Sequence, residues 1–221
     1  GDGIPDYLDR ESINWGTLEQ LTYTNVSNIF PDICIDSADI IHLVWQKEIG
    51  GDYEIFYKKS TDGGDDWTGA TRLTWTNSYC RNTFMKTDMN NNVHIVWDNN
   101  SSGNHELYYR KSTDCAETWS ALTRLTYTSG NSFNSNFSFA SNDNVYIVFQ
   151  DNSPGGYEVY SKRKINMGTV WTCVFRETWG DGFSNISKPK ILLDSDENFH
   201  LVWYGDKSGN NKIYYRKGVI Y

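Results

Sequence analysis

The sequence lacks the features that mark helical, membrane-spanning and nucleic-acid-binding proteins. No window of about a dozen residues carries apolar side chains at the 3.6-residue spacing of an amphipathic helix. No apolar run approaches the roughly 20 residues that cross a bilayer. The net charge of −8 argues against a basic surface for nucleic acid or anionic lipid. We therefore expect neither membrane insertion nor a nucleic-acid partner.

Cysteine is also scarce, whereas aromatic and small polar residues are abundant. The four cysteines show no C-x-x-C spacing, so the sequence carries no zinc signature. Aromatic residues make up 15% of the chain, with nine Trp and fifteen Tyr, and they are interspersed with Gly, Asn, Ser, Thr and Asp. This composition is typical of short strands joined by polar turns. The sequence therefore predicts an all-β fold.

A turn-like octapeptide recurs along the chain at a fixed interval. It reads STDGGDDW over Ser60–Trp67 and STDCAETW over Ser112–Trp119, an interval of 52 residues from position 60 to position 112. A worn third copy ends at Trp171, and one step back from the first copy lies Trp15. A period in the range of roughly 20–50 residues is the sequence sign of a repeat architecture.

A second repeated segment precedes each octapeptide. It is an apolar strand with an aromatic residue at its end, and its four copies are His42–Trp45, His94–Trp97, Tyr146–Phe149 and His200–Trp203. A polar loop and a strand rich in β-branched and aromatic residues follow each copy. A less regular strand before this segment and an outer strand after the octapeptide bring the repeat to four strands. Four-stranded antiparallel units that repeat around an axis are the blades of a β-propeller.

The count of strands predicts four blades, with a shared last blade. The fourth repeat stops at Lys217, before any octapeptide, and residues 15–23 match the missing outer strand. We therefore expect residues 13–221 to form a four-bladed ring in which residues 15–23 complete the last blade. Two alternatives stay open, namely an open fragment of a larger ring and one half of an eight-bladed dimer.

The octapeptide resembles the Asp box of the bacterial neuraminidase repeat family, whose sialidase-like members are β-propellers. The matching residues are Ser60, Asp62, Gly64 and Trp67 in the first box, Ser112, Asp114 and Trp119 in the second, and Gly168 and Trp171 in the third. The resemblance implies that the box is a structural turn on the side of the propeller opposite the ligand site. A short Asp or Ser side chain that bonds its own turn's amides is consistent with this role.

The arginines do not fit a sialidase-like active site. The resemblance implies a clamp of three arginines, a tyrosine paired with a glutamate and an arginine-isoleucine-proline signature. Only Arg10 and Arg81 stand outside repeated positions, and the signature is absent. We therefore expect a non-catalytic protein. Glycoside hydrolysis by a pair of loop carboxylates remains an alternative, with candidates Glu48, Asp98, Asp151, Asp181 and Asp206.

Binding through the loops is the favoured function. Sugars stack on aromatic rings and bond carboxylates and amides, so repeated sites of this composition would suit a multivalent lectin. The candidate ligand-binding residues are Trp45, Glu54, Arg81, Trp97, Asp98, Asn99, Glu106, Asp151, Glu158 and Trp203. A repeated Val-Trp pair is also typical of core packing, whereas we expect Arg81, Asp98 and Asn99 to be exposed. The expected partner is a glycan or a cell-surface protein, and a structural or adhesive spacer is the remaining alternative.

The first residues point to an extracellular context. Residues 1–12 form an acidic linker that resembles the end of a thrombospondin type 3-like calcium repeat, with Asp2, Asp6 and Asp9 as possible Ca²⁺ ligands. Ca²⁺ prefers six to eight oxygens, which three carboxylates cannot supply alone. No other cofactor is expected. Such segments link domains, so we expect a secreted or cell-surface protein with further domains. Two disulfides, Cys115–Cys173 and Cys34–Cys80, or four free thiols are both compatible with the sequence.

Overall fold

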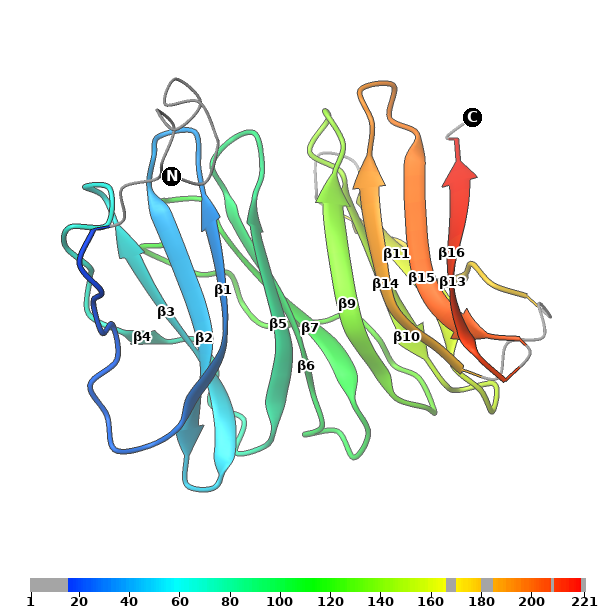
Figure 1. Ribbon diagram of the computed structural model, residues 1–221, viewed down its shortest axis with the longest axis horizontal. Helices are drawn as coiled ribbons and strands as arrows, with labels where there is room; N and C mark the ends of the chain where they lie inside the picture. Colours follow the sequence, from blue (N-terminus) through cyan, green and yellow to red (C-terminus); the bar gives the residue numbers. More distant parts are fainter. Residues whose placement is uncertain (1–15, 166–169, 180–184, 208, 220–221) are drawn as a thin grey trace, which may run out of the picture.

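The computed structural model describes residues 16–165, 170–179, 185–207 and 209–219. Over these residues the chain consists of strands and turns, with no helix, as the composition predicts. The strands form four antiparallel sheets that follow one another along the chain, from β1–β4 on the left of Figure 1 to β14–β16 on its right. No helix in the described ranges is long and apolar enough to span a membrane.

Each of the first three sheets contains the inner, second, third and outer strands that the repeat predicts. The first contains β1 (Asn28–Ile35), β2 (Ile41–Ile49), β3 (Asp52–Ser60) and β4 (Thr71–Arg72). The second contains β5 (Cys80–Thr87), β6 (Val93–Asn99), β7 (Glu106–Ser112) and β8 (Thr123–Arg124). The third contains β9 (Ser132–Phe139), β10 (Val145–Asp151) and β11 (Glu158–Ile165), with β12 (Val170–Trp171) and β13 (Phe175–Arg176) both paired to β11.

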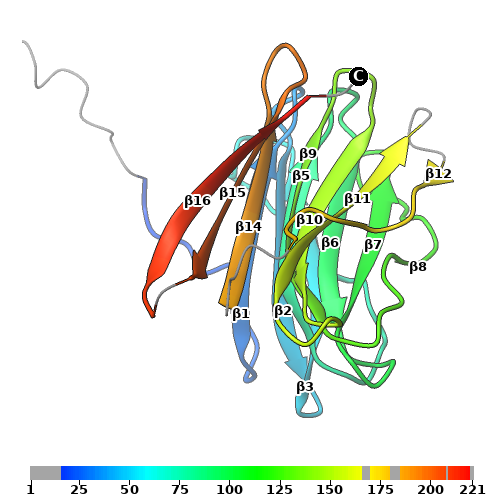
Figure 2. The same ribbon diagram turned by 90° about the vertical axis from the view of Figure 1, so that its right-hand side faces the viewer.

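The last sheet has three strands, and this differs from the sequence prediction. It contains β14 (Asn185–Leu193), β15 (Phe199–Asp206) and β16 (Asn211–Gly218), and β16 is its edge strand (Figure 2). Residues 16–23 were expected to complete this blade, but they form no strand. The carbonyl of Leu21 instead accepts a 2.8 Å hydrogen bond from Lys58 Nζ of β3. Trp15 lies outside the described residues.

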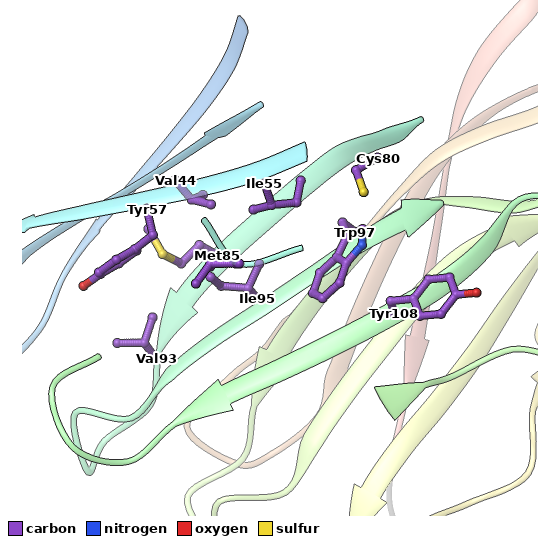
Figure 3. Close-up of a cluster of buried hydrophobic side chains, with 10 residues drawn as sticks. Val44, Ile55, Tyr57, Cys80, Met85, Val93, Ile95, Trp97 and Tyr108 are labelled. Carbon is purple, nitrogen blue, oxygen red and sulfur yellow. The ribbon is translucent and has the colours of Figure 1, made fainter. Parts of the chain in front are cut away.

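The core lies between successive sheets. One cluster joins the first two sheets, where Val44 and Ile55 meet Met85 and Ile95 (Figure 3). Two further clusters join the second sheet to the third and the third to the fourth. Among the described strands, β14–β16 contacts strands of the third sheet and none of β1–β4. The described residues therefore form an open series of four sheets.

The two well-preserved octapeptides form nearly identical turns. Ser60 Oγ accepts a 2.9 Å hydrogen bond from Gly64 N and donates to Asp62 Oδ1, and Ser112 makes the same contacts with Ala116 N and Asp114. Hydrogen bonds from Thr118 and Ser112 lower the pKa of Asp114 to about 2. Ala116, which replaces a glycine, takes a left-handed φ of 63°. Gly168 lies outside the described residues.

The tryptophans of the second and third octapeptides hold neighbouring sheets together. Trp119 packs edge-on against Tyr57 of the preceding sheet at 5.3 Å between ring centroids, and Trp171 packs against Tyr109 at 5.1 Å. In three sheets a tyrosine of the third strand bonds a repeated histidine, which in turn lies beside an aspartate. The three triads are Asp36–His42–Tyr57, Asp88–His94–Tyr109 and Asp194–His200–Tyr215. These histidines are therefore parts of the blades. All four cysteines are free thiols.

A bulge interrupts every inner strand at the same repeat position. The pairing of β1, β5, β9 and β14 with the next strand shifts register there. The residues with a left-handed φ of about 50° at the four bulges are Phe30, Asn82, Asn134 and Lys188. A bulge bends its strand and redirects a side chain. The backbone is thus the same in each blade, whereas the side chain differs.

Candidate functional site

The sheets have two ends, and the repeat positions separate them. One end carries the boxes and the β1–β2 turn. The other end, which we call the loop face, carries the β2–β3, β6–β7 and β10–β11 turns and lies at the bottom of Figure 1. The four bulges lie toward the loop face, because they pair with the last residues of the second strands. A site made by different residues from each blade can therefore form at this end.

The repeated tryptophans of the candidate set belong to the core. Trp45, Trp97 and Trp203 are all buried, and each faces an aromatic ring of the third strand of its own sheet. Trp45 donates from its indole Nε1 to Asn28 at 2.9 Å. The structure therefore places these three rings where they pack the blades and not at the surface of the loop face.

The repeated glutamates of the candidate set are clamped by their own blades. Glu54 accepts hydrogen bonds from Thr74 Oγ1 and the amide of Thr76, and it lies 3.2 Å from Arg72 Nη2. The same pairing recurs as Glu106 with Arg124 at 3.0 Å and Glu158 with Arg176 at 2.5 Å. These carboxylates hold the outer strand against the third strand.

Two polar candidates stabilise loops from inside. Asn99 is fully buried, and its amide donates to Ser78 Oγ at 2.7 Å. Asp151 is buried as well, and it accepts hydrogen bonds from Thr128 and Ser132. The prediction that Asn99 is exposed was wrong. A polar side chain at a strand end can be buried when it forms hydrogen bonds with the backbone and hydroxyl groups of the adjacent turn.

Asp98 is the centre of a polar cluster that belongs to the second blade alone. Its carboxylate is fully buried, contrary to the expected exposure. Arg81 donates to Asp98 Oδ2 at 3.0 Å, and Asn82 donates to Oδ1 at 2.7 Å. His105 Nδ1 lies 3.1 Å from the same Oδ2. Arg81 remains partly exposed, with its guanidinium 5.7 Å from the ring centroid of Phe133.

The cluster replaces a neutral arrangement found in the neighbouring blades. Gln46 and Gln150 occupy the position of Asp98, and Gln150 Oε1 accepts hydrogen bonds from Asn134 and from Ser187 of the next sheet. The second blade has exchanged this amide for a carboxylate and has an arginine at the preceding strand's start. A comparison of the copies position by position identifies Arg81 and Asp98, but His105 has no such signal because it lies in a loop.

A pocket opens beside this cluster, at the bulges of three inner strands. Its volume is about 210 Å³, and it is lined by Asn82, Thr83, Phe84, Asn134, Ser135, Lys188, Pro189 and Lys190. We call it the central pocket. Asn82 connects it with Asp98, since the same side chain bonds the carboxylate and lines the pocket. Sequence reasoning missed Lys188 and Lys190, although both differ from their counterparts in the other repeats.

The central pocket is locally cationic in an acidic chain. Lys190 Nζ lies 4.9 Å from the ring centroid of Phe84, and Lys86 Nζ lies 5.4 Å from it. Burial lowers the pKa of both ammonium groups, and the charge of Lys190 lowers that of Lys86 further. Burial also raises the pKa of the nearby carboxyl of Asp32. Cations that are crowded in this way are stabilised by an added anion.

The structure offers no support for a metal at the loop face. Within the described ranges, no group of three His, Cys, Asp or Glu side chains is arranged to hold an ion. The proposed calcium ligands Asp2, Asp6 and Asp9 lie outside the described residues.

Comparison with known proteins shows the fold. No family model matches the sequence, and no curated protein matches it either. Among solved structures, a protein of unknown function from Dyadobacter fermentans is similar over 80% of this chain and 57% of its own, at 13% identity and a TM-score of 0.60. A Hadza microbial sialidase matches over 86% and 44%, at 9% identity and 0.64. A leech intramolecular trans-sialidase matches over 93% and 52%, at 11% and 0.66.

These similarities support a propeller-like arrangement of the four sheets. Arabinanases and an ulvan lyase are among the other similar structures, so several glycan-active proteins share the fold. At identities this low the likeness extends to the fold alone. The chain spans 57% and 44% of the first two structures, which are therefore considerably longer than this chain.

Proposed function

We propose that this chain is a non-catalytic extracellular module that binds an acidic glycan at the central pocket. The observation that carries the proposal is the grouping of Lys188 and Lys190 with amide groups at the bulges, on a chain whose net charge is −8. Cations collected at one concave site in an acidic protein favour a localised anion over general electrostatic attraction.

The chemistry of the lining selects the class of ligand. Lysine ammonium groups bond carboxylate or sulfate oxygens. The amide nitrogens of Asn82 and Asn134 donate to Asp98 and Gln150, and their amide oxygens can accept hydrogen bonds from sugar hydroxyls. The ring of Phe84 supplies an apolar surface in the same pocket. A carboxylated or sulfated sugar presents all three kinds of group. The two lysines, Lys188 and Lys190, have exposed side chains, whereas the repeated tryptophans and glutamates are engaged inside their own blades.

The Asp-box identity of the repeat belongs to this proposal. It is supported by the paired Ser–Asp turns of the first two octapeptides and by the tryptophans that join successive sheets. A secreted or cell-surface location follows from the same proposal, because acidic polysaccharides are met outside the cell.

The test is binding to matched oligosaccharides that carry carboxylate, sulfate or no charge. We expect the charged ligands alone to bind, with affinity that falls as salt is added. The variant K188S/K190S should lose about tenfold or more in affinity, which corresponds to ~1.4 kcal/mol. Lys217→Ser, an exposed lysine at the opposite end of the sheets, is the control for lost charge and should bind normally.

Other results would replace the proposal. Equal binding by the double variant would remove the central pocket as the site. Release of a shorter sugar on prolonged incubation would favour the alternative of a glycoside hydrolase, for which the buried Asp98 beside Arg81 and His105 is the first carboxylate to substitute. Absence of binding to every oligosaccharide would favour a spacer or a protein-binding module.

A further inference from the structure

The trailing face of the last sheet exposes positions that are buried in every other sheet. Ile213 of β16 is 77% exposed, although its counterparts in the first three sheets are completely buried. These counterparts are Ile55, Leu107 and Val159. Tyr215 and Val202 are exposed in the same way, whereas Tyr57 and Val44 are buried. The difference arises because each earlier sheet is covered by the next one and the last sheet is not.

The leading face of the first sheet shows the complementary exposure. Ile33 of β1 is 61% exposed, whereas its counterparts Met85, Phe137 and Ile191 lie in the core between sheets. Phe30, at the first bulge, is also exposed. The series of sheets therefore ends in two apolar faces, and each has the side chains with which sheets of this repeat pack on one another.

Residues 16–23 lie where a preceding blade would have its outer strand. The carbonyl of Leu21 accepts a hydrogen bond from Lys58, and the carbonyl of Glu177 accepts one from Arg216. Lys58 and Arg216 occupy one repeat position, and so do Leu21 and Glu177. Glu177 follows β13 of the third sheet, whereas Arg216 lies in β16 of the fourth sheet, so this hydrogen bond joins a sheet to the one before it. The first segment therefore already occupies the outer position of a blade that would precede β1–β4.

The side chains of this segment match the last sheet, for which the described residues form no outer strand. In the first three sheets an arginine of the outer strand pairs with a glutamate of the third strand. At the corresponding positions the segment has Gln20 and the last sheet has Lys212. Both partners of the repeated ion pair have changed. Contact between Gln20 and Lys212 would therefore leave neither an unpaired buried carboxylate nor two like charges.

The last sheet of the same chain does not fill this place. Among the described strands, β14–β16 makes its contacts with the third sheet and none with β1–β4. We propose that the last sheet of a second copy of this chain docks against the leading face of β1–β4, with its β16 beside residues 16–23. The contact is head to tail, so repeated use of it generates a ring or a longer assembly.

The experiment measures mass against concentration by sedimentation equilibrium on the full chain. We expect the wild-type chain to associate to a dimer or a larger assembly. Ile213→Asp and Ile33→Asp change side chains that are exposed in the single chain, so each should leave its circular dichroism spectrum unchanged. Each should raise the dissociation constant by about tenfold or more, because association would bury the carboxylate. Met89→Ser, an exposed apolar side chain within the series, is the control.

A second pair of variants tests the register. Gln20→Arg with Lys212→Glu would recreate the ion pair of the first three sheets and should tighten association, whereas Lys212→Glu alone should not. A wild-type chain that stays monomeric at every concentration would overturn the proposal, as would a dimer that both aspartate variants leave intact. The glycan-binding proposal does not depend on this result.

Discussion

The guanidinium of Arg81 donates from Nε to Asp98 Oδ2 over 3.0 Å, and it is the charged partner of a carboxylate with no exposed surface. The pair occupies positions where the first blade has Ile29 and Gln46 and the third has Phe133 and Gln150. It has therefore replaced a neutral arrangement at the rim of the central pocket.

Removal of Arg81 should destabilise the fold by leaving this carboxylate buried without its counter-ion. We expect Arg81→Ala to lower the free energy of unfolding by about 2 kcal/mol, less than for a fully buried pair because Arg81 is partly exposed. R81I/D98Q restores the arrangement of the first blade and should recover most of the loss. Urea denaturation measures both values. An Arg81→Ala variant as stable as wild type would contradict this account.

The serine that opens the second octapeptide should matter more than its position in a surface turn suggests. Ser112 is buried, and its hydroxyl accepts from Ala116 N at 2.9 Å and donates to Asp114 at 2.8 Å. Ser112→Ala leaves the partly buried amide of Ala116 without its partner and should cost about 1 kcal/mol in thermal or urea unfolding. Thr113→Ala, at the exposed neighbouring position, is the control, and an equal loss for both variants would argue against the turn as the cause.

Acid should destabilise the protein before its carboxylates begin to titrate. Burial lowers the pKa of His94 and of His42 below the ordinary value of 6.5. The unfolded chain therefore takes up protons first, and stability that is complete above pH 6.5 is lost as the pH falls toward the folded pKa values. The free energy of unfolding measured at a series of pH values should show this slope. In H42Q/H94Q the slope over this range should be smaller, and an unchanged slope would assign it to other groups.

Glycan binding should weaken at alkaline pH. The pKa values of Lys86 and Lys190 lie below the ordinary 10.5, mainly because of burial. A bound anion favours the charged form and raises these pKa values, so affinity must fall as the pH rises through them. Titration calorimetry with a sulfated oligosaccharide, from about pH 7 to about pH 10, measures the change. An affinity that stays constant over this range would mean that Lys190, which lines the pocket, does not contact the anion.

The four thiols should divide into two classes. Burial raises the pKa of Cys34 to about 12 and that of Cys80 to about 11, whereas Cys115 and Cys173 are exposed. The thiolate is the reactive form, so an alkylating reagent should modify Cys115 and Cys173 quickly in the native protein. Peptide mass spectrometry identifies the labelled positions, and denaturant should expose all four. Rapid labelling of Cys80 in the native state would contradict its burial.

The sequence predicts the blades well because their interactions recur. The interval between boxes, the aromatic ends of the second strands and the turn residues all reflect contacts made within one repeat or between adjacent repeats, and the structure contains the strands they indicate. The path of residues 16–23 was mispredicted because their resemblance to an outer strand is local. The local resemblance indicates that these residues are like an outer strand. It does not indicate which sheet they lie beside, because that depends on how the first and last sheets are placed.

The residues of the central pocket were not predicted from the sequence, for a related reason. Trp97 and Glu106 were predicted to bind ligand because they recur in the repeats. Their recurrence reflects structural roles inside each blade, since Trp97 packs in the core and Glu106 pairs with Arg124. Lys188 and Lys190 do not recur and have no motif. Their meeting with Asn82 and Asn134 follows from the convergence of inner strands, which no single repeat encodes.

At the bulges of the inner strands, the backbone conformation is shared by all four sheets, whereas the residue type varies. All four copies adopt the same left-handed backbone there, yet they present phenylalanine, asparagine, asparagine and lysine. Asparagine tolerates this conformation better than most residues, so a library of Asn variants at Phe30 and Lys188 would start from a relaxed backbone. Directed evolution confined to Phe30 and Lys188 would vary two exposed side chains, whereas Asn82 and Asn134 must keep their hydrogen bonds to the buried Asp98 and Gln150.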